Sequence, residues 1–568
     1  MPRLSEQVVH ILAGEGLDVE EDRGGYLLRT GPGETPLSVW VNETDRVVRA
    51  EQVLAYPVDD FSPSLGRALD WLNLHRGGVC YSFQEAQRAV VGSTMWSSPN
   101  RDPSTNQIHL LVALLMQAKV RDSSALSRVA EGEAASASVV IGRDTRAHSR
   151  ALSRRVKAGA EALGARVEDV GVVTTPQLHH CVRAANGFSG EIIKGPLYGY
   201  ADALVDAFES LLRTASHKTG RSDATVVVDC AGGVGAFGVH QLRRRLEERG
   251  LASVLSLRAA NMVREAPLND CCGAEHVQKQ RLPPKNLSRR DLGVPNLRGC
   301  SLDGDADRLV YWFHGRDAFE IVDGDKIAAL LAVFIASELA AAQPLIGKPS
   351  LGVVQTAYAN GAAAAFLRER SVEVAFAKTG VKYVHHAAEA FDVGVYFEAN
   401  GHGTVLVRDS LRERLAQLDR EPGTGGRARL AVSRLHAVAR LANQAVGDAL
   451  ADLLLVEAVL CLQQKSIAAW GALYDELPSR QLKQRVASRA LLEPNATETR
   501  LVAPAALQAK IDALAASHKS GRAFVRPSGT EDVVRVYAEA ATRRDADALA
   551  LDVRRAVFDL AGGLGERP

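Results

Sequence analysis

The sequence has few cysteines, and no spacing among them suggests that they act together. Seven cysteines are spread over 568 residues, and no two of them stand in a C-x-x-C motif. An odd, scattered set argues against a disulfide framework and against a zinc ribbon. We therefore expect a protein of a reducing compartment, and the predicted location is cytoplasmic.

The chain also lacks a long uninterrupted apolar run and an excess of charge of either sign. Its longest apolar stretch, IAALLAVFIASELAAA, contains Ser337 and Glu338, and the N-terminal stretch has no signal-peptide core. The net charge is +1, which gives no support for binding to nucleic acid or to an anionic membrane. We expect neither of these partners.

What the sequence does contain is enough apolar material for several domains. Hydrophobic residues make up 46% and charged residues 24% of the chain, a composition typical of soluble globular proteins. At roughly 150 residues per domain, this length predicts several folded units.

The first 130 or so residues predict a small α+β module. Helical periodicity in LSEQVVHILAGEGL, SLGRALDWLNLH and NQIHLLVALLMQAKV accompanies strand-like GYLLRT, PLSVWVN, VCYSF and RAVVGSTMW. The pattern resembles the bacterial YbjN-like modules related to secretion chaperones. That resemblance implies an interaction module, for which we expect a protein partner.

From about Ala137 the pattern changes to short β runs that alternate with Ala/Leu-rich helices. Examples are ASVVIGRDTR before ALSRRVKAGAEALG, and ATVVVDC before a glycine turn and a helix. Recurrent strand–turn–helix units predict α/β domains with helices covering parallel sheets. The stretch LDREPGTGGRARL (418–430) is expected to be an exposed linker or loop, and the C-terminal tail predicts a two-layer α+β domain.

The segment SLDGDADR (301–308) places three carboxylates at alternate positions. In an extended or looped backbone Asp303, Asp305 and Asp307 share one side and can converge. At about 5 Å and an effective dielectric near 20, each carboxylate pair repels by roughly 3 kcal/mol. A hard divalent cation reverses that cost, and an EF-hand is excluded because Arg308 and His314 stand where it requires Gly and Glu. We expect Mg²⁺ with one coordination position free for a phosphate; a solvated acidic turn is the alternative.

A second segment, RPSGTED (526–532) with Arg535, collects donors suited to a phosphate dianion. Ser528, Gly529 and Thr530 offer backbone N–H groups and two hydroxyls, and Arg526 and Arg535 flank them. An ordinary Pro-Ser-Gly turn with a surface salt bridge explains the spacing equally well.

Other polar segments are weaker signals by themselves. In YFEANGHGT (396–404), Glu398, Asn400 and His402 alternate with small residues, as expected for a loop that contacts sugar hydroxyls or for a purely structural loop. Further candidates stand in AKTGVKYVHH and GRDTR, namely Lys378, Lys382, His385, His386, Arg143 and Arg146. Together these segments put cation, phosphate and polyol binders on separate elements of one α/β chain.

Five long segments, taken in order, resemble the phosphoacetylglucosamine mutase family of the α-D-phosphohexomutase superfamily. They are SLDGDADRLVYWF, VVQTAYANG, KTGVKYVHH, GVYFEANGHGT and RAFVRPSGTEDVVRVYAEA, and the match runs from about Ser138 to the C-terminus. The resemblance implies three related α/β mixed-sheet domains and a fourth, C-terminal α+β domain around one cleft. It also implies the interconversion of N-acetylglucosamine 6-phosphate and 1-phosphate on the way to UDP-N-acetylglucosamine.

The expected boundaries follow from this match. They are 1–130 for the N-terminal module, 131–220 for a truncated first mutase domain, 221–318 for the second domain with the metal loop, 319–435 for the third with the sugar-binding loop, and 436–568 for the C-terminal phosphate-binding domain.

The resemblance also assigns roles to residues. Asp303, Asp305 and Asp307 would be the Mg²⁺ ligands. The sugar ring would be held by Glu398, Ala399 and Asn400, and the phosphate that is not reacting by Arg526, Pro527, Ser528, Gly529, Thr530 and Arg535. The small-molecule partner implied is a sugar phosphate.

The family's nucleophile is missing from its expected place. The phosphoserine loop of this branch has the sequence Thr-Ala-Ser-His-Asn-Pro and precedes the segment that matches VVIGRDTR, whereas STMWSSPN (93–100) is its nearest approach here. RTASHKTGRS (213–222) carries the Ala-Ser-His core, but it lies between a helix and the strand ATVVVDC, so we expect Ser216 to be a linker residue. The first domain's sheet is then expected to lack a strand.

Loss of a covalent nucleophile can cost about 10⁶-fold in rate. The resemblance still predicts the function of a phosphoacetylglucosamine mutase, an intramolecular phosphotransferase. The sequence does not identify its catalytic residue. A catalytically silent sugar-phosphate-binding protein with an N-terminal interaction module is the alternative. A Mg²⁺-dependent phosphatase is a third hypothesis, but DGDADR does not match its D-x-D-x-[TV] pattern.

Overall fold

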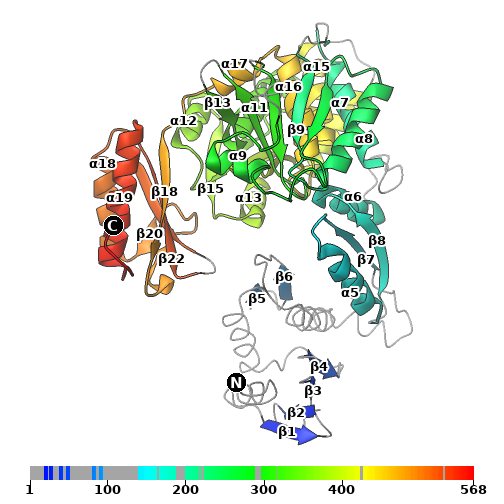
Figure 1. The fold of residues 1–568 in the computed structure, drawn as a ribbon. Helices are drawn as coiled ribbons and strands as arrows, with labels where there is room; N and C mark the ends of the chain where they lie inside the picture. The colour runs from blue at the N-terminus through cyan, green and yellow to red at the C-terminus, as the bar shows by residue number, and fades with distance from the viewer. Residues whose placement is uncertain are drawn as a thin grey trace. The chain divides into compact units, whose positions relative to one another are not determined.

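The computed structural model describes six strands within the first 137 residues and most of the chain beyond them. From Ser138 onward it describes all residues except 163–164, 187–198, 217–218, 221–222, 288–293, 295, 316–317, 422–425 and 529–530. The chain divides into two compact units, residues 1–139 with 151–169, and residues 140–150 with 170–568 (Figure 1).

The first unit contains an antiparallel four-stranded sheet in the order β1-β2-β3-β4 and a two-stranded ladder, β5-β6. The strands are β1 (Asp18–Asp22), β2 (Gly25–Arg29), β3 (Leu37–Asn42), β4 (Val47–Glu51), β5 (Cys80–Gln84) and β6 (Ala89–Ser93). The strands expected in GYLLRT, PLSVWVN, VCYSF and RAVVGSTMW are confirmed. The three helices expected in this module lie outside the described residues.

The next segment alternates strands and helices, as predicted for a mutase-like first domain. Its elements are β7 (Ser138–Arg143), α5 (Ser149–Ala162), β8 (Arg166–Val172) and α6 (Thr175–Ala185). Among the described residues, β7 and β8 form a sheet of two strands; the expected loss of a strand from this sheet stays a prediction. Helix α6 begins with a capping box, in which Thr174 accepts from the backbone N–H of Gln177 and the Gln177 side chain accepts in return.

A five-stranded mixed sheet, in the order β10-β9-β11-β12-β13, forms the next domain. Its strands are β9 (Thr225–Asp229), β10 (Ser256–Ala260), β11 (Arg298–Leu302), β12 (Leu309–His314) and β13 (Phe319–Val322). Strand β9 is parallel to both β10 and β11, whereas β12 returns antiparallel. The run TVVVD is almost fully buried, as expected for a central strand covered on both faces.

A second mixed sheet, in the order β15-β14-β16-β17, repeats this plan. Its strands are β14 (Leu351–Thr356), β15 (Glu373–Ala377), β16 (Val393–Phe397) and β17 (Gly403–Val407). In both sheets the last central parallel strand is followed by an antiparallel one, and the connecting loop holds predicted site residues.

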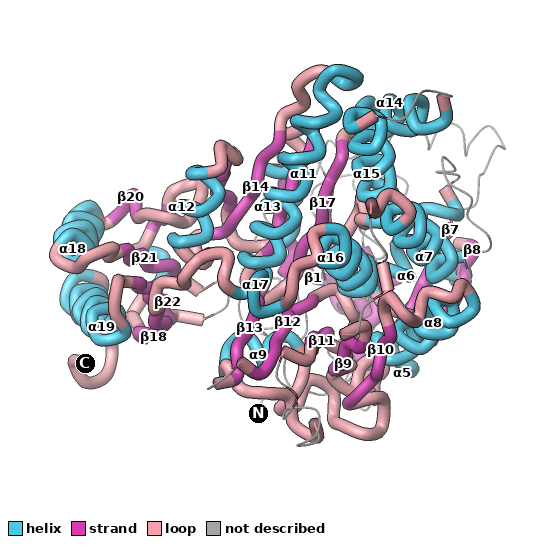
Figure 2. The backbone as a smooth tube through the Cα atoms, turned by 90° about the horizontal axis from the view of Figure 1, so that it is seen from above, coloured by secondary structure: helices cyan, strands magenta, loops and turns pink. Residues whose placement is uncertain are grey.

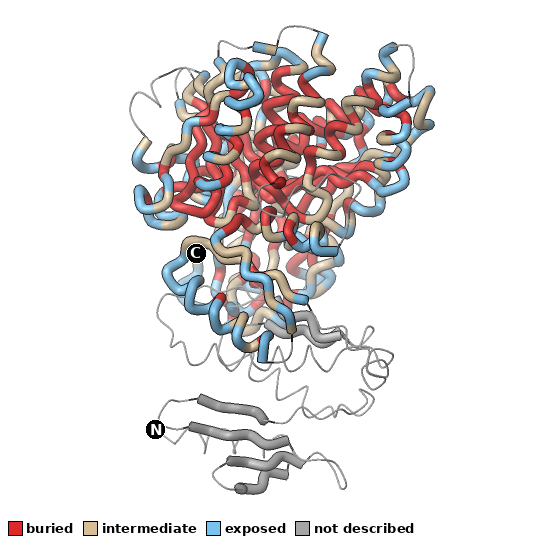
Figure 3. The backbone as a smooth tube through the Cα atoms, turned by 90° about the vertical axis from the view of Figure 1, so that its right-hand side faces the viewer, coloured by how far each residue is buried: buried red, intermediate tan, exposed pale blue. Residues whose placement is uncertain are grey.

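Most helices around these sheets share one large apolar core, seen as the continuous buried region in Figure 3. The helices in this core are α7 (Gly199–Leu212), α8 (Gly235–Glu248), α11 (Gly324–Ile346), α12 (Gly361–Glu369), α14 (Asp409–Arg420), α15 (Arg427–Leu441), α16 (Ala449–Leu462) and α17 (Ile467–Gly471). Helices α9 (Ala274–Gln280) and α13 (Val381–Ala388) pack in two smaller apolar clusters of their own. The loop expected over residues 418–430 is shorter than predicted, because α14 continues to Arg420 and α15 begins at Arg427. The domain boundary predicted at residues 435–436 falls inside α15.

Helix α11 is, among the described residues, the one helix long and apolar enough to span a bilayer by length and composition. Half of its most apolar window is buried inside the protein, and it packs against α15, α16 and strand β16. Its apolarity is therefore accounted for by its place in the core.

The C-terminal part is a two-layer α+β domain, as predicted. Strands β18 (Ser479–Arg485), β22 (Val533–Glu539) and β21 (Arg522–Pro527) form an antiparallel sheet in that order. Helices α18 (Ala505–Ala516) and α19 (Arg543–Leu560) pack against it and enclose a separate apolar cluster (Figure 2). The 3₁₀ turn η2 (Arg489–Leu491) and the short pair β19 (Glu493–Pro494) and β20 (Leu501–Ala503) complete the domain.

Candidate metal and phosphate site

The three aspartates occupy the hairpin between β11 and β12, and they converge as predicted. One oxygen from each of Asp303, Asp305 and Asp307 lies within 4.8 Å of the other two. Ala306 has φ of +60° and is fully buried, so the small side chain allows the left-handed turn that brings the three carboxylates to one side.

The charges in this hairpin are only partly compensated by the protein. Burial raises the pKa of Asp303 well above its usual value, and the nearby carboxylates of Asp307 and Asp305 add to the rise. Burial also works to raise the pKa of Asp307, but a hydrogen bond and charge from His402, with Arg308, lower it overall. The Arg308 Nε lies 3.7 Å from both Asp303 Oδ2 and Asp307 Oδ1.

The donor set fits a small hard cation. Asp307 Oδ1 is buried and accepts no hydrogen bond from the described residues, which is costly for a carboxylate oxygen unless a ligand satisfies it. Three converging carboxylates with an unsatisfied oxygen are the all-oxygen environment that Mg²⁺ requires. Mg²⁺, the cofactor that the resemblance implies, therefore fits the residues present.

A threonine that the sequence analysis did not single out completes this cluster. The Thr175 hydroxyl donates to Asp305 Oδ2 at 2.6 Å, and the Thr175 backbone N–H donates to the Asp305 carbonyl at 3.0 Å. Thr175 is the first residue of α6, directly after the capping Thr174. The capping signal Thr-Thr-Pro-Gln could have located the helix start, but no local pattern indicates a partner 130 residues away.

The predicted sugar-binding loop joins the metal hairpin. Glu398, Ala399 and Asn400 are half-buried in the turn between β16 and β17. The Leu309 backbone N–H donates to the Gly401 carbonyl at 3.0 Å, and His402 Nδ1 lies 3.2 Å from Asp307 Oδ2. The structure therefore brings together two loops that the sequence separates by about ninety residues.

The predicted phosphate-binding residues lie at one end of the β21–β22 hairpin. Arg526 and Arg535 are directly paired across the two strands, so their side chains share one face of the sheet. Burial raises the pKa of Tyr358, and the positive charges of both arginines oppose that rise. Ser528 is buried and its N–H donates to Val533 at 2.8 Å, Pro527 ends β21, and Gly529 and Thr530 lie outside the described residues.

Glu498 is a second residue that the sequence analysis missed. Its carboxylate, which is 4% exposed, lies 2.7 Å from Arg526 Nε and 4.0 Å from Lys378 Nζ. It also accepts from the backbone N–H of Thr379 at 3.1 Å. Glu498 therefore fixes the Arg526 guanidinium against the loop before α13, and its loop sequence NATETR carries no signal for this role.

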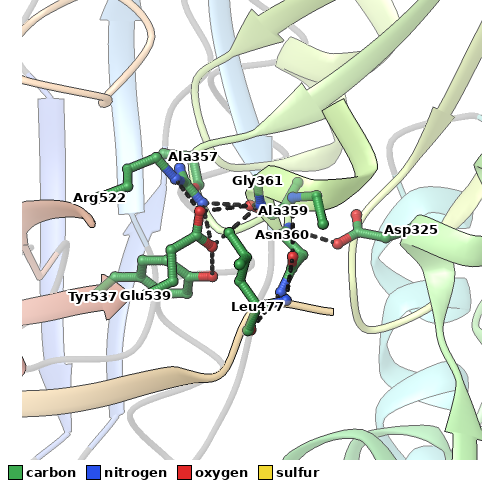
Figure 4. Close-up of polar contacts among 10 residues, drawn as sticks. Asp325, Ala357, Ala359, Asn360, Gly361, Leu477, Arg522, Tyr537 and Glu539 are labelled. Carbon is green, nitrogen blue, oxygen red and sulfur yellow. Dashed lines mark hydrogen bonds and ion pairs between the residues drawn. The ribbon is translucent and has the colours of Figure 1, made fainter. Parts of the chain in front are cut away.

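An ion pair between buried Glu539 and Arg522, whose side chain is 32% exposed, holds the C-terminal sheet against the β14–α12 turn (Figure 4). Arg522 donates to Glu539 at 2.7 Å and to the carbonyls of Ala357 and Ala359 at 2.9 and 2.6 Å. Glu539 in turn accepts from the Gly361 N–H at 3.1 Å and the Tyr537 hydroxyl at 2.8 Å. The Arg522 and Glu539 side chains therefore link the C-terminal domain to the domain that contains β14 and α12.

The remaining sequence candidates have structural partners. His385 contacts the Tyr396 hydroxyl at 3.1 Å and His386 contacts Glu389 at 2.8 Å. Lys382 lies over the Tyr383 ring, and Arg146 pairs with Asp144. Ser216 is exposed in the connection between α7 and β9, where a linker residue was expected.

Family models match three parts of the chain. Residues 119–195 match "Phosphoglucomutase/phosphomannomutase, alpha/beta/alpha domain I". Residues 323–465 match "Phosphoacetylglucosamine mutase AMG1, domain III", and residues 483–556 match "Phosphoglucomutase/phosphomannomutase, C-terminal domain".

Curated relatives and solved structures agree with these models. The chain is 44% identical to human phosphoacetylglucosamine mutase over 76% of its own length and 77% of the relative's, and 41% identical to the Arabidopsis thaliana enzyme over 80% and 81%. A crystal structure of Aspergillus fumigatus N-acetylphosphoglucosamine mutase with GlcNAc-6P and magnesium is 37% identical. It has a TM-score of 0.69 and covers 78% of this chain and 88% of that one. A crystal structure of an N-acetylglucosamine-phosphate mutase of the α-D-phosphohexomutase superfamily, in the product complex, is 35% identical. It has a TM-score of 0.69 and covers 76% of this chain and 79% of that one.

Proposed function

The chain belongs to the phosphoacetylglucosamine mutases of the α-D-phosphohexomutase superfamily, and from that membership we propose that it interconverts N-acetylglucosamine 6-phosphate and N-acetylglucosamine 1-phosphate. It is an enzyme of the intramolecular phosphotransferase class, within the isomerases. Its product would enter UDP-N-acetylglucosamine biosynthesis.

The observation that carries this proposal is the junction of the metal hairpin with the sugar loop. The Arg308 and His402 backbones form a β-bridge, and His402 contacts Asp307. A residue of the proposed sugar loop therefore orients a proposed metal ligand, which a solvated acidic turn would not require. This geometry favours a built site over an ordinary turn.

Asp303, Asp305 and Asp307 would hold Mg²⁺, which when bound neutralises the carboxylates and the charge of a transferring phosphoryl group. The chain's own residues position the substrate. Glu398, Ala399 and Asn400 line the turn beside the metal hairpin, where they would contact the sugar hydroxyls.

Arg526, Pro527, Ser528, Gly529, Thr530 and Arg535 would hold the phosphate that is not reacting. The Glu498 carboxylate lies 2.7 Å from Arg526 Nε, and this ion pair restricts the guanidinium before a ligand binds. Charge-assisted hydrogen bonds of this kind contribute about 1.5–3 kcal/mol each.

The chain lacks the residue that carries the phosphoryl group in this family, the serine of the phosphoserine loop. The sequence contains no Thr-Ala-Ser-His-Asn-Pro segment, and the described hydroxyl that hydrogen-bonds to the aspartate cluster belongs to Thr175. Loss of a covalent nucleophile costs about 10⁶-fold, so we expect slow turnover with substrate binding retained.

A coupled assay of N-acetylglucosamine 6-phosphate conversion, with Mg²⁺ and glucose 1,6-bisphosphate, tests the proposal. Mg²⁺-dependent formation of the 1-phosphate above an enzyme-free blank, abolished in Asp305→Asn, supports it. Absence of turnover, at enzyme concentrations and incubation times that would detect a reaction slowed about 10⁶-fold, contradicts it.

The missing loop favours one second candidate, a sugar-phosphate-binding protein that lacks catalysis. Calorimetry that shows Mg²⁺-dependent binding of N-acetylglucosamine 6-phosphate without turnover would select this candidate, and absence of binding would remove it. Its N-terminal module would then serve a protein partner. We also propose a cytoplasmic location, supported by the six described cysteines, all of which are free thiols, with no nucleic-acid or membrane partner.

A further inference from the structure

A small hollow of mixed polar and apolar lining lies between helices α6, α7, α14 and α15 and shares no residue with the metal and phosphate site. Its cavity is about 70 Å³, whereas one water needs roughly 10–15 Å³. The space is therefore sufficient for a group the size of a phosphate. The polar lining includes His180, Arg183, Tyr200, Arg412, Arg440 and Asp448.

Three arginines from three different helices line this hollow. Arg183 belongs to α6, Arg412 to α14 and Arg440 to α15. Within the described part of the chain, no ion pair is formed by the Arg183 or Arg440 side chain, although the charge of Arg440 acts on Asp419 of α14. Arg412 pairs with Asp409 at 2.8 Å, but Asp409 is 83% exposed, so this surface pair is weak.

The acid that lines the hollow is already used by the protein. Asp448 accepts from the Tyr200 hydroxyl at 2.6 Å, from Asn443 at 3.0 Å and from the Ala451 N–H at 3.1 Å. These bonds cap α16 and fix Tyr200 in place. Asp448 thus forms part of the wall and does not pair with the three arginines.

Two buried nitrogen atoms in the lining lack a hydrogen-bond partner among the described residues. They are His180 Nε2 and Arg412 Nε. Buried polar atoms in native proteins almost always have a partner, and a guanidinium Nε–H can only donate. A ligand with several acceptor oxygens would satisfy the Arg412 Nε–H, and also His180 Nε2 in the tautomer that carries the proton on that nitrogen.

We propose that this hollow is a second anion site that takes a phosphate group. Guanidinium groups match the geometry and charge of phosphate oxygens, and arginines from three separate helices line this hollow. The ligand is inorganic phosphate or the phosphoryl group of a small phosphate ester. The site is independent of Mg²⁺, because no lining residue belongs to the aspartate hairpin.

Titration calorimetry on the full chain in EDTA tests this site, with Arg526→Gln as the background to remove the proposed substrate phosphate site. The pocket variant is Arg412→Gln with Arg440→Gln. The matched control is Arg414→Gln, an exposed arginine on the same helix that contacts Gln417. Inorganic phosphate, glucose 6-phosphate and phosphate-free N-acetylglucosamine are titrated separately.

We expect one phosphate site in the Arg526→Gln background, unchanged by Arg414→Gln and weakened at least tenfold by the double substitution. If the double variant does not fold, Arg183→Gln, on another helix, is expected to weaken phosphate binding in the same direction.

Tighter binding of glucose 6-phosphate than of phosphate identifies an ester ligand, and the reverse identifies the free anion. Absence of binding by both, equal binding of N-acetylglucosamine, or binding that survives the double substitution overturns the proposal. Because these titrations contain no Mg²⁺ and no intact Arg526, their result is separate from the test of mutase function.

Discussion

The Thr175 hydroxyl donates a hydrogen bond to Asp305 Oδ2 at 2.6 Å, and the two residues are 130 positions apart in the chain. The bond ties the first turn of α6 to the middle carboxylate of the metal hairpin. A ligand held in this way keeps its free oxygen directed at the cation, since its rotation is restricted.

Replacing Thr175 with Val removes this bond while preserving the branched shape of the side chain. Loss of a group that orients a metal ligand typically costs 10–100-fold in affinity, so we expect Mg²⁺ to bind about tenfold more weakly. Calorimetric titration of Mg²⁺ measures the effect. Thr175→Ser, which keeps the hydroxyl, should restore the affinity; an unchanged affinity in Thr175→Val would remove the orienting role.

Removal of Mg²⁺ should destabilise the protein. The three carboxylates repel one another and Asp307 Oδ1 lacks a hydrogen-bond donor among the described residues, so a cation that binds only the folded state stabilises it. At a concentration 100 times its Kd the gain is about 2.7 kcal/mol. Thermal unfolding with Mg²⁺ and with EDTA measures this difference, which should vanish in Asp305→Asn and persist in Asp552→Asn, a control on α19.

Glu498 should be required for tight phosphate binding although it does not itself contact the phosphate. Glu498→Gln keeps the shape but removes the charge that holds Arg526, and we expect an affinity for N-acetylglucosamine 6-phosphate reduced about tenfold, as for one charge-assisted bond. Arg526→Gln should reduce it as much or more, and combining both should add little. Fully additive effects in calorimetry would show that the two residues act independently.

The Arg522–Glu539 pair should contribute strongly to the docking of the C-terminal domain. Glu539→Ala leaves Arg522 and the Gly361 N–H without their acceptor. Breaking a fully buried ion pair costs about 3–5 kcal/mol, and because the Arg522 side chain is 32% exposed, we expect a loss at or below the lower end of that range. Urea unfolding measures the loss. Arg522→Met with Glu539→Leu should recover much of it, because no unpaired charge remains; a double variant as unstable as Glu539→Ala would contradict this assignment.

Much of the fold was predictable because its signals are local. The apolar run TVVVD and the repeated strand–glycine turn–helix pattern predicted the α/β class. The spacing of the three aspartates at every second position predicted that they share one side of a loop. The end of α14 at Arg420 was missed because Gly and Pro in the sequence 418–430 suggested a longer loop than the six residues between α14 and α15.

The parts of the site that could not be predicted depend on contacts between distant segments. Thr175 stands in a helix-capping signal that does not indicate its partner, and Glu498 stands in no motif. Each acts through a partner more than 25 residues away. The tertiary fold alone brings His402 to Asp307. A single sequence shows which residue types are present, but not which of them meet.

Binding of N-acetylglucosamine 6-phosphate in the presence and absence of Mg²⁺ tests the central claim most directly. The account predicts calorimetric binding that requires Mg²⁺, is lost in Asp305→Asn and is weakened in Arg526→Gln, with Arg414→Gln unchanged. Binding that is indifferent to Mg²⁺ and to both substitutions, or no binding in any condition, would contradict it.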